Sequence, residues 1–143
     1  MRPLDAAECI DRARVHAAAA ANIEGEWSAV AYFYAAYHLV RHALQSDPVF
    51  ADLNRLKSYD SNLVPDDRSV TVHQARRGAG VKTFGVNDLV RILYPDITPE
   101  YLALHELSVA VRYGRGISAS DLDDARRAYE AIRAAIESGL AAA

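Results

Sequence analysis

Two histidines, His38 and His42, are spaced in a way that suits metal chemistry. Four residues apart on a helix, both imidazoles point to one side. Two ligands do not make a metal site, however. His105 and Glu106 could complete one if their helix faced the first, yet no HExxH motif is present. We therefore expect these histidines to make hydrogen bonds or to lie at the surface, and we expect no metal or other cofactor.

A basic cluster occupies the middle of the chain and consists of Arg68, His73, Arg76, Arg77 and Lys82. Arginines in a glycine-containing loop can follow phosphates, and nearby aromatic side chains can stack on bases. Several aspartates lie in the same stretch and favour an ordinary solvated loop instead. Both interpretations stay open: a solvated loop, or a segment that binds nucleic acid or another anionic partner.

Three other kinds of site are disfavoured by residue type and spacing. Residues 78–83 resemble the end of a phosphate-binding loop, but Val81 separates the last glycine from Lys82, and Ala75 stands where another glycine is needed. The chain has one cysteine, Cys9, so it cannot form an internal disulfide. We expect Cys9 to be a small buried side chain rather than a nucleophile. Serine–histidine–aspartate catalysis lacks its G-x-S-x-G motif.

The length of 143 residues predicts one domain spanning 1–143, and the net charge of −3 argues against a general polycation. The stretch from Trp27 to Val40 carries no formal charge but is shorter than the ~20 residues that span a bilayer. Asp5 and Glu8 stand where a signal peptide would need a basic start and an apolar run. We therefore expect a cytoplasmic protein with no membrane association.

Apolar periodicity and helix-start signals predict the elements that must position these residues. Asp5 and Glu8 form a capping-box pattern, Thr98 and Pro99 are expected as N-cap and first helical residue, and Ser120 is expected to begin the last helix. That last helix is expected to carry the i,i+4 pairs Asp123/Arg127 and Arg126/Glu130. The helices are expected at about 5–22, 26–45, 49–57, from 87 to Pro95, 98–114 and from 120 onward.

Residues 58–69 are expected to form a loop, and 69–86 either a small hairpin or an irregular segment. The fold class is therefore all-α: an antiparallel four-helix-type bundle with an extra short helix and an irregular middle segment, with or without a small hairpin.

Two segments resemble those of HEPN-domain proteins. Ala29–Leu44, with the sequence AVAYFYAAYHLVRHAL, resembles the tyrosine-rich second helix of that family. Glu106–Gly114, followed by the helix Ser118–Ala135, resembles its paired closing helices, and Val72–Gly78 is similar to the connection after the second helix. Together these matches cover most of the chain in order.

The resemblance implies a compact antiparallel bundle, usually dimeric, of the kind found in ribonucleases of toxin and defence systems and in non-catalytic partners of nucleotidyltransferases. Nuclease members carry a motif in which an arginine is followed by a polar residue, three further residues and then a histidine. A tyrosine stands two positions after that histidine. If Tyr113 takes that tyrosine's place, Glu106 and Val111 occupy the arginine and histidine positions. A carboxylate repels phosphate and valine cannot move a proton, so both catalytic groups are missing.

Two functions remain open. The first is a non-catalytic HEPN-like module, homodimeric, that binds a protein partner such as a nucleotidyltransferase or an anionic or nucleic-acid ligand. The alternative is a metal-independent ribonuclease of a toxin or defence system that uses other basic residues. The candidate ligand-binding residues are His73, Arg76, Arg77, Lys82, Arg41, His42 and Arg112.

The homodimer is expected because the second helix has apolar groups around most of its circumference. Small residues on the first two helices would allow close approach, and tyrosines would add contact area. These residues are Ala17, Ala20, Ala35, Ala36, Tyr32 and Tyr37. The competing interpretation is that residues 48–85 fold over this surface within one chain.

Overall fold

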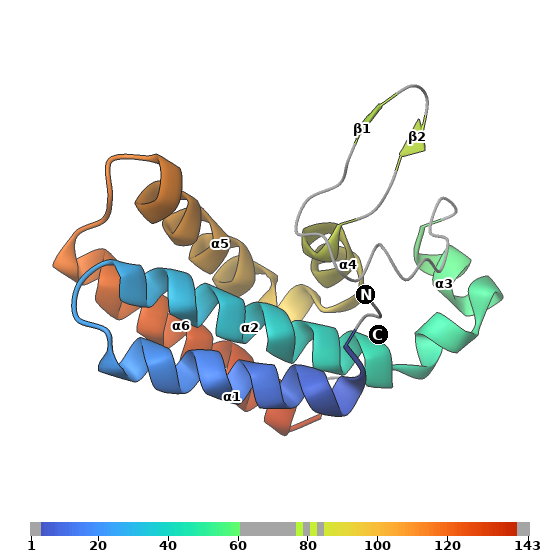
Figure 1. The fold of residues 1–143 in the computed structure, drawn as a ribbon. Helices are drawn as coiled ribbons and strands as arrows, with labels where there is room; N and C mark the ends of the chain where they lie inside the picture. Colours follow the sequence, from blue (N-terminus) through green and yellow to red (C-terminus); the bar gives the residue numbers. More distant parts are fainter. Residues whose placement is uncertain (1–3, 61–76, 79–80, 83–84, 140–143) are drawn as a thin grey trace.

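The computed structural model describes residues 4–60, 77–78, 81–82 and 85–139 (Figure 1). These residues form an all-α bundle, as predicted. Its helices are α1 (Ala6–Asn22), α2 (Trp27–Ser46), α3 (Leu53–Tyr59), α4 (Val86–Leu93), α5 (Thr98–Tyr113) and α6 (Ala119–Glu137). Short 3-10 turns cover Pro48–Ala51 and Pro95–Ile97.

A small antiparallel hairpin joins β1 (Arg77–Gly78) to β2 (Val81–Lys82), with Arg77 opposite Lys82. It stands apart from the long helices, above α4 in the view of Figure 1. The sequence predicted either a small hairpin or an irregular segment at this place, and the described residues form a hairpin.

Helices α1 and α2 pack closely against each other along their length. Asp5 caps α1 as predicted: its carboxylate accepts from the Glu8 backbone N–H at 2.8 Å, and Glu8 accepts from the Asp5 N–H at 3.3 Å. The buried residues of α1 are small, namely Cys9, Ala13 and Ala20. Near the turn between the two helices, the Ser28 hydroxyl of α2 donates directly to the Ala20 carbonyl of α1 at 2.8 Å.

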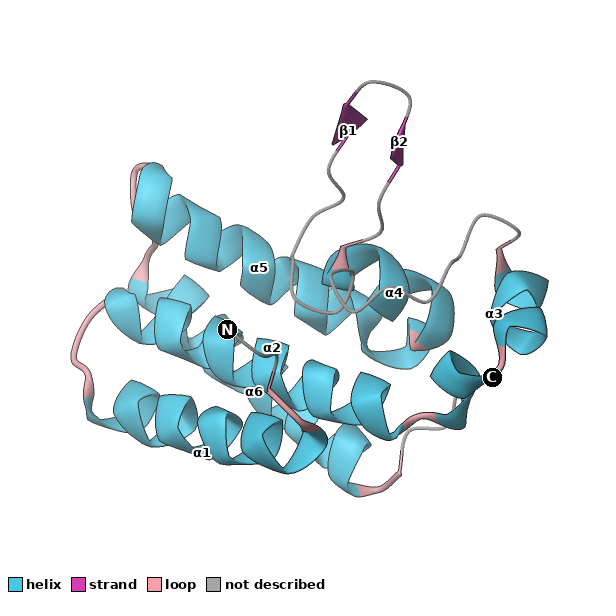
Figure 2. Cartoon of the chain, turned by 45° about the vertical axis from the view of Figure 1, so that its right-hand side comes forward, coloured by secondary structure: helices cyan, strands magenta, loops and turns pink. Residues whose placement is uncertain are grey.

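Helix α2 is the centre of the bundle. It packs on α1, α5 and α6 (Figure 2), and Tyr32 meets Tyr129 of α6 while Phe33 meets Tyr101 of α5. Its residues are buried on most of the circumference, so helices of the same chain cover the apolar surface from which a dimer was inferred. Trp27 is an exception, because this first residue of α2 is 53% exposed.

The starts of α5 and α6 differ from the predictions. Thr98 is already helical and is not the N-cap; its hydroxyl donates to the carbonyls of Tyr94 at 3.0 Å and Val90 at 3.2 Å, which ties α5 to the end of α4. The N-cap of α6 is Ser118 rather than Ser120, and it forms a capping box with Asp121.

The charge pairs on α6 also differ in spacing from those predicted. The arginines pair mostly with acids three residues away: Arg126 with Asp123, Arg127 with Asp124 and Arg133 with Glu130.

No helix of the described ranges is long and apolar enough to cross a membrane.

Replacing Ser118 by Ala is expected to lower the free energy of unfolding by about 1 kcal/mol, because the first turn of α6 loses its side-chain acceptor. Ser120→Ala is the matched control and is expected to change stability by less than about 0.5 kcal/mol. Urea denaturation of both variants measures the difference, and equal losses would contradict the assignment of the cap.

Candidate functional site

The arginines Arg41 and Arg112 lie on tyrosine rings that follow one side of α2. The Arg41 guanidinium carbon is 5.6 Å from the centre of the Tyr37 ring, and that of Arg112 is 5.7 Å from the centre of the Tyr34 ring. Arg112 also donates to the Tyr34 hydroxyl at 3.2 Å. The two tyrosine rings meet edge to face at 6.4 Å. We call Tyr34, Tyr37, Arg41 and Arg112 the Arg–Tyr row.

Neither arginine of this row has a carboxylate of the described residues within ion-pair distance, whereas Arg14, Arg126, Arg127 and Arg133 all pair with acids. Arg41 is only 5% exposed, and its Nε has no hydrogen-bond partner among the described residues. A buried charge without a counter-charge is costly. Arg112 is only partly buried, so an external anion could contact its guanidinium directly, whereas Arg41 would act on an anion through its charge.

Histidines surround the row without forming a metal site. The rings of His16 (α1) and His38 (α2) stack 5.3 Å apart with an interplanar angle of 5°. His42 Nδ1 donates to the Ala6 carbonyl at 2.7 Å, in agreement with the expectation of a hydrogen-bonding histidine. Among the residues whose placement is described, no three metal-ligating side chains come together.

The pKa values of two imidazoles, those of His16 and His105, are lowered, which favours their neutral form. Burial lowers the pKa of His16, and the nearby Arg12 lowers it further. Burial also lowers the pKa of His105, with Arg112 adding to the effect and Glu106 opposing it. Each of the two imidazoles thus takes up a proton less readily than a free histidine does.

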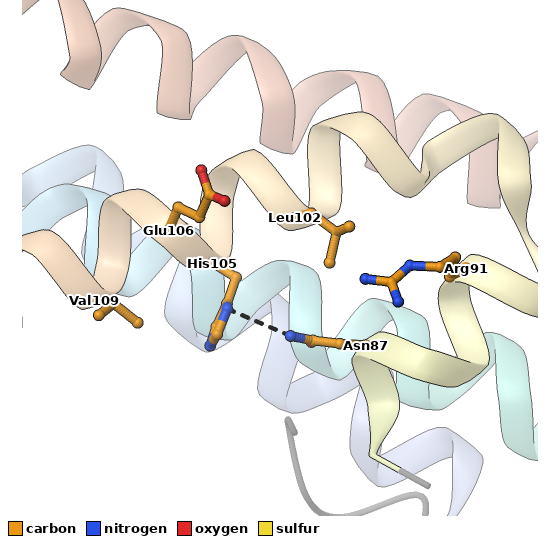
Figure 3. A pocket seen from close by; sticks show the side chains of 6 residues that line it. All are labelled: Asn87, Arg91, Leu102, His105, Glu106 and Val109. Carbon is orange, nitrogen blue, oxygen red and sulfur yellow. Dashed lines mark hydrogen bonds between the residues drawn. The ribbon is translucent and has the colours of Figure 1, made fainter. Parts of the chain in front are cut away.

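A pocket of about 350 Å³ opens between α4 and α5 (Figure 3). Its lining comes from both helices: Asn87 and Arg91 from α4, and Leu102, His105, Glu106 and Val109 from α5. Asn87 Nδ2 donates to His105 Nδ1 over 3.4 Å, while Asn87 Oδ1 is buried and has no partner in the part of the chain that the structure describes. His105 is also packed against Phe33, with ring centres 5.1 Å apart.

The predicted site residues have different outcomes. Arg41 and Arg112 come together in the Arg–Tyr row, whereas His42 is bonded to the start of α1. His73 and Arg76 lie outside the described residues. Arg77 and Lys82 are described only as backbone partners of the hairpin.

Asn87 and Arg91 were not predicted from the sequence. Their i,i+4 spacing places both on one side of α4, but no local signal shows that α5 faces them. For His105, hydrogen bonding or a surface position was preferred over metal binding, and in the structure it is hydrogen-bonded to Asn87 and lines the pocket beside Glu106. Cys9 is fully buried, as predicted, and burial raises the pKa of its thiol.

Comparison with known proteins adds no family to this description. No protein-family model matches the sequence, and no curated protein or solved structure is significantly similar to it.

The free energy of unfolding is expected to fall when the pH is lowered from about 7 to about 5.5. In the unfolded chain both histidines take up a proton near their ordinary value of 6.5, whereas in the folded chain the lowered pKa values delay this. The unfolded state then binds more protons, which costs the fold up to about 1.4 kcal/mol per pH unit for each histidine. Urea denaturation at each pH measures how the free energy of unfolding changes with pH. The double variant His16→Gln/His105→Gln is expected to show a weaker pH dependence. An unchanged pH dependence in this variant would contradict the assignment of the effect to these two histidines.

Proposed function

We propose that this protein is a non-catalytic, HEPN-like helical module that binds a phosphate-bearing ligand, RNA in particular, through its Arg–Tyr row. The observation that carries the proposal is the pair of guanidinium groups, Arg41 and Arg112, that rest on tyrosine rings without a carboxylate partner among the described residues. Guanidinium groups bind phosphate oxygens in a bidentate manner, and aromatic rings stack on unpaired bases.

The exposed Tyr113 adds to this argument. It follows Arg112 at the end of α5, is 79% exposed, and has the Arg112 guanidinium carbon 5.1 Å from its ring centre. Arg112 is thus held between Tyr34 and Tyr113. This arrangement provides a positive charge beside an accessible ring, as a phosphate and an adjacent base require.

The non-catalytic part of the proposal rests on two α5 residues. In the resemblance to HEPN-domain proteins, Glu106 and Val111 occupy the positions of the nuclease arginine and histidine. Val111 is buried, so the side chain at that position faces the core rather than a substrate. Glu106 is exposed, and its negative charge repels phosphate.

We propose the homodimer and a nucleotidyltransferase-type protein partner on the basis of the same resemblance. Because α2 is covered within the chain, the dimer interface is better sought at the exposed ring of Trp27, which leaves Tyr113 accessible to RNA. The Ile117 backbone N–H donates to Glu26 at 3.0 Å, which brings the turn after α5 to the start of α2, next to Trp27.

Light scattering at micromolar concentration is expected to give twice the 15.7 kDa of one chain. Trp27→Ser is expected to shift the protein toward the monomer, because it removes an exposed aromatic contact surface. A mass of one chain that stays constant on tenfold concentration would contradict the dimer.

Arg112→Gln is expected to weaken binding of a single-stranded RNA oligonucleotide about tenfold, because it removes an accessible charge that contacts phosphate. Arg127→Gln is the matched control: this α6 arginine is exposed and paired with Asp124, and its loss is expected to change the affinity less than about twofold. Fluorescence anisotropy at two salt concentrations measures both the affinity and its salt dependence.

Arg41→Met separates binding from folding. Methionine fills a similar space without a charge, so this variant is expected to bind RNA more weakly yet unfold at the same or a higher urea concentration. RNA binding left intact by both Arg112→Gln and Arg41→Met would overturn the proposal. Metal-independent RNA cleavage that is lost in Arg112→Gln or His73→Ala would instead support the alternative, a ribonuclease.

A further inference from the structure

The pocket between α4 and α5 is lined by two opposite charges that are not paired with each other. Arg91 and Glu106 are both exposed, and neither forms an ion pair with another described residue. Figure 3 shows them on opposite sides of the pocket, with Leu102 between them. The pocket therefore offers one site for an anion and another for a cation.

A buried acceptor lies in the same pocket wall. Asn87 is only 8% exposed; its Nδ2 is used in the hydrogen bond to His105, and its Oδ1 has no donor among the described residues. An unsatisfied buried carbonyl oxygen is unfavourable, so a donor brought by a ligand would be favoured at this position. An ammonium group supplies such a donor together with the charge that Glu106 attracts.

We propose that this pocket binds a small zwitterion, namely a free aliphatic α-amino acid. Its carboxylate binds Arg91, its ammonium group binds Glu106 and Asn87 Oδ1, and its side chain packs on Leu102 and Val109. The volume of about 350 Å³ accommodates a molecule of this size with water beside it.

The charges of the pocket disfavour other ligand classes. A phosphate ester is repelled by Glu106, and a simple amine is repelled by Arg91. The lowered pKa of His105 keeps its imidazole neutral at pH 7, so it adds no third charge to the pocket. The inference does not depend on RNA binding, since none of these residues belongs to the Arg–Tyr row.

Titration of L-leucine into the full chain, followed by two-dimensional NMR, tests the proposal. We expect saturable shifts at the amide signals of Asn87, Arg91 and Glu106, with a dissociation constant in the millimolar range or below. The matched probes 4-methylpentanoate, which lacks the ammonium group, and 3-methylbutylamine, which lacks the carboxylate, are expected to bind at least tenfold more weakly.

Variants at the pocket complete the test. Arg91→Gln and Glu106→Gln change exposed side chains, so they are expected to leave the fold intact and to weaken leucine binding about tenfold each. Arg127→Gln on α6 is expected to leave it unchanged. No saturable shift with leucine, equal binding of either matched probe, or tighter binding of adenosine monophosphate at the same signals would overturn the proposal.

Discussion

The close contact between α1 and α2 is the constraint on which the rest of the bundle depends. The fully buried residues of α1 are small, and the Ser28 hydroxyl reaches the Ala20 carbonyl directly at the turn between the helices. On the other sides of α2, Phe33 meets Tyr101 of α5 and Tyr32 meets Tyr129 of α6. The large rings of the core thus gather mainly where α2 faces α5 and α6.

The same arrangement explains why polar groups lie so deep in the protein. A helix covered on most sides has no fully solvated face, so His38 and Arg41 are buried together with the apolar residues. The protein compensates for part of this with ring contacts, namely His16 on His38 and Tyr37 beside Arg41. Ring contacts compensate a guanidinium less fully than a carboxylate does.

Local signals predicted the helices well, and they failed where a distant contact decides between similar patterns. Asp5 and Glu8 form a capping box within one turn, so the start of α1 could be predicted from four residues. Ser118 and Ser120 both have an aspartate three residues later, and sequence alone does not distinguish them. The hydrogen bond from Ile117 to Glu26, 91 residues away in sequence, fixes the preceding turn and thereby selects Ser118.

The candidate sites were less predictable for the same physical reason. Arg112 meets Tyr34 across 78 positions of sequence, and Asn87 meets His105 across 18. Periodicity assigned these residues to helices, but it does not say which helix faces which. The sequence correctly indicated apolar residues around most of α2, but the structure shows that helices of the same chain cover most of them.

The exposure of Trp27 has a consequence for how this protein can be observed. It is the only tryptophan, and it stands half in solvent at the start of α2, away from the aromatic contacts of the core. In a single chain its emission is therefore expected to be close to that of a solvated indole and to change little on unfolding. The same property makes it a sensitive optical reporter for any molecule that covers this end of the bundle and excludes water from the ring.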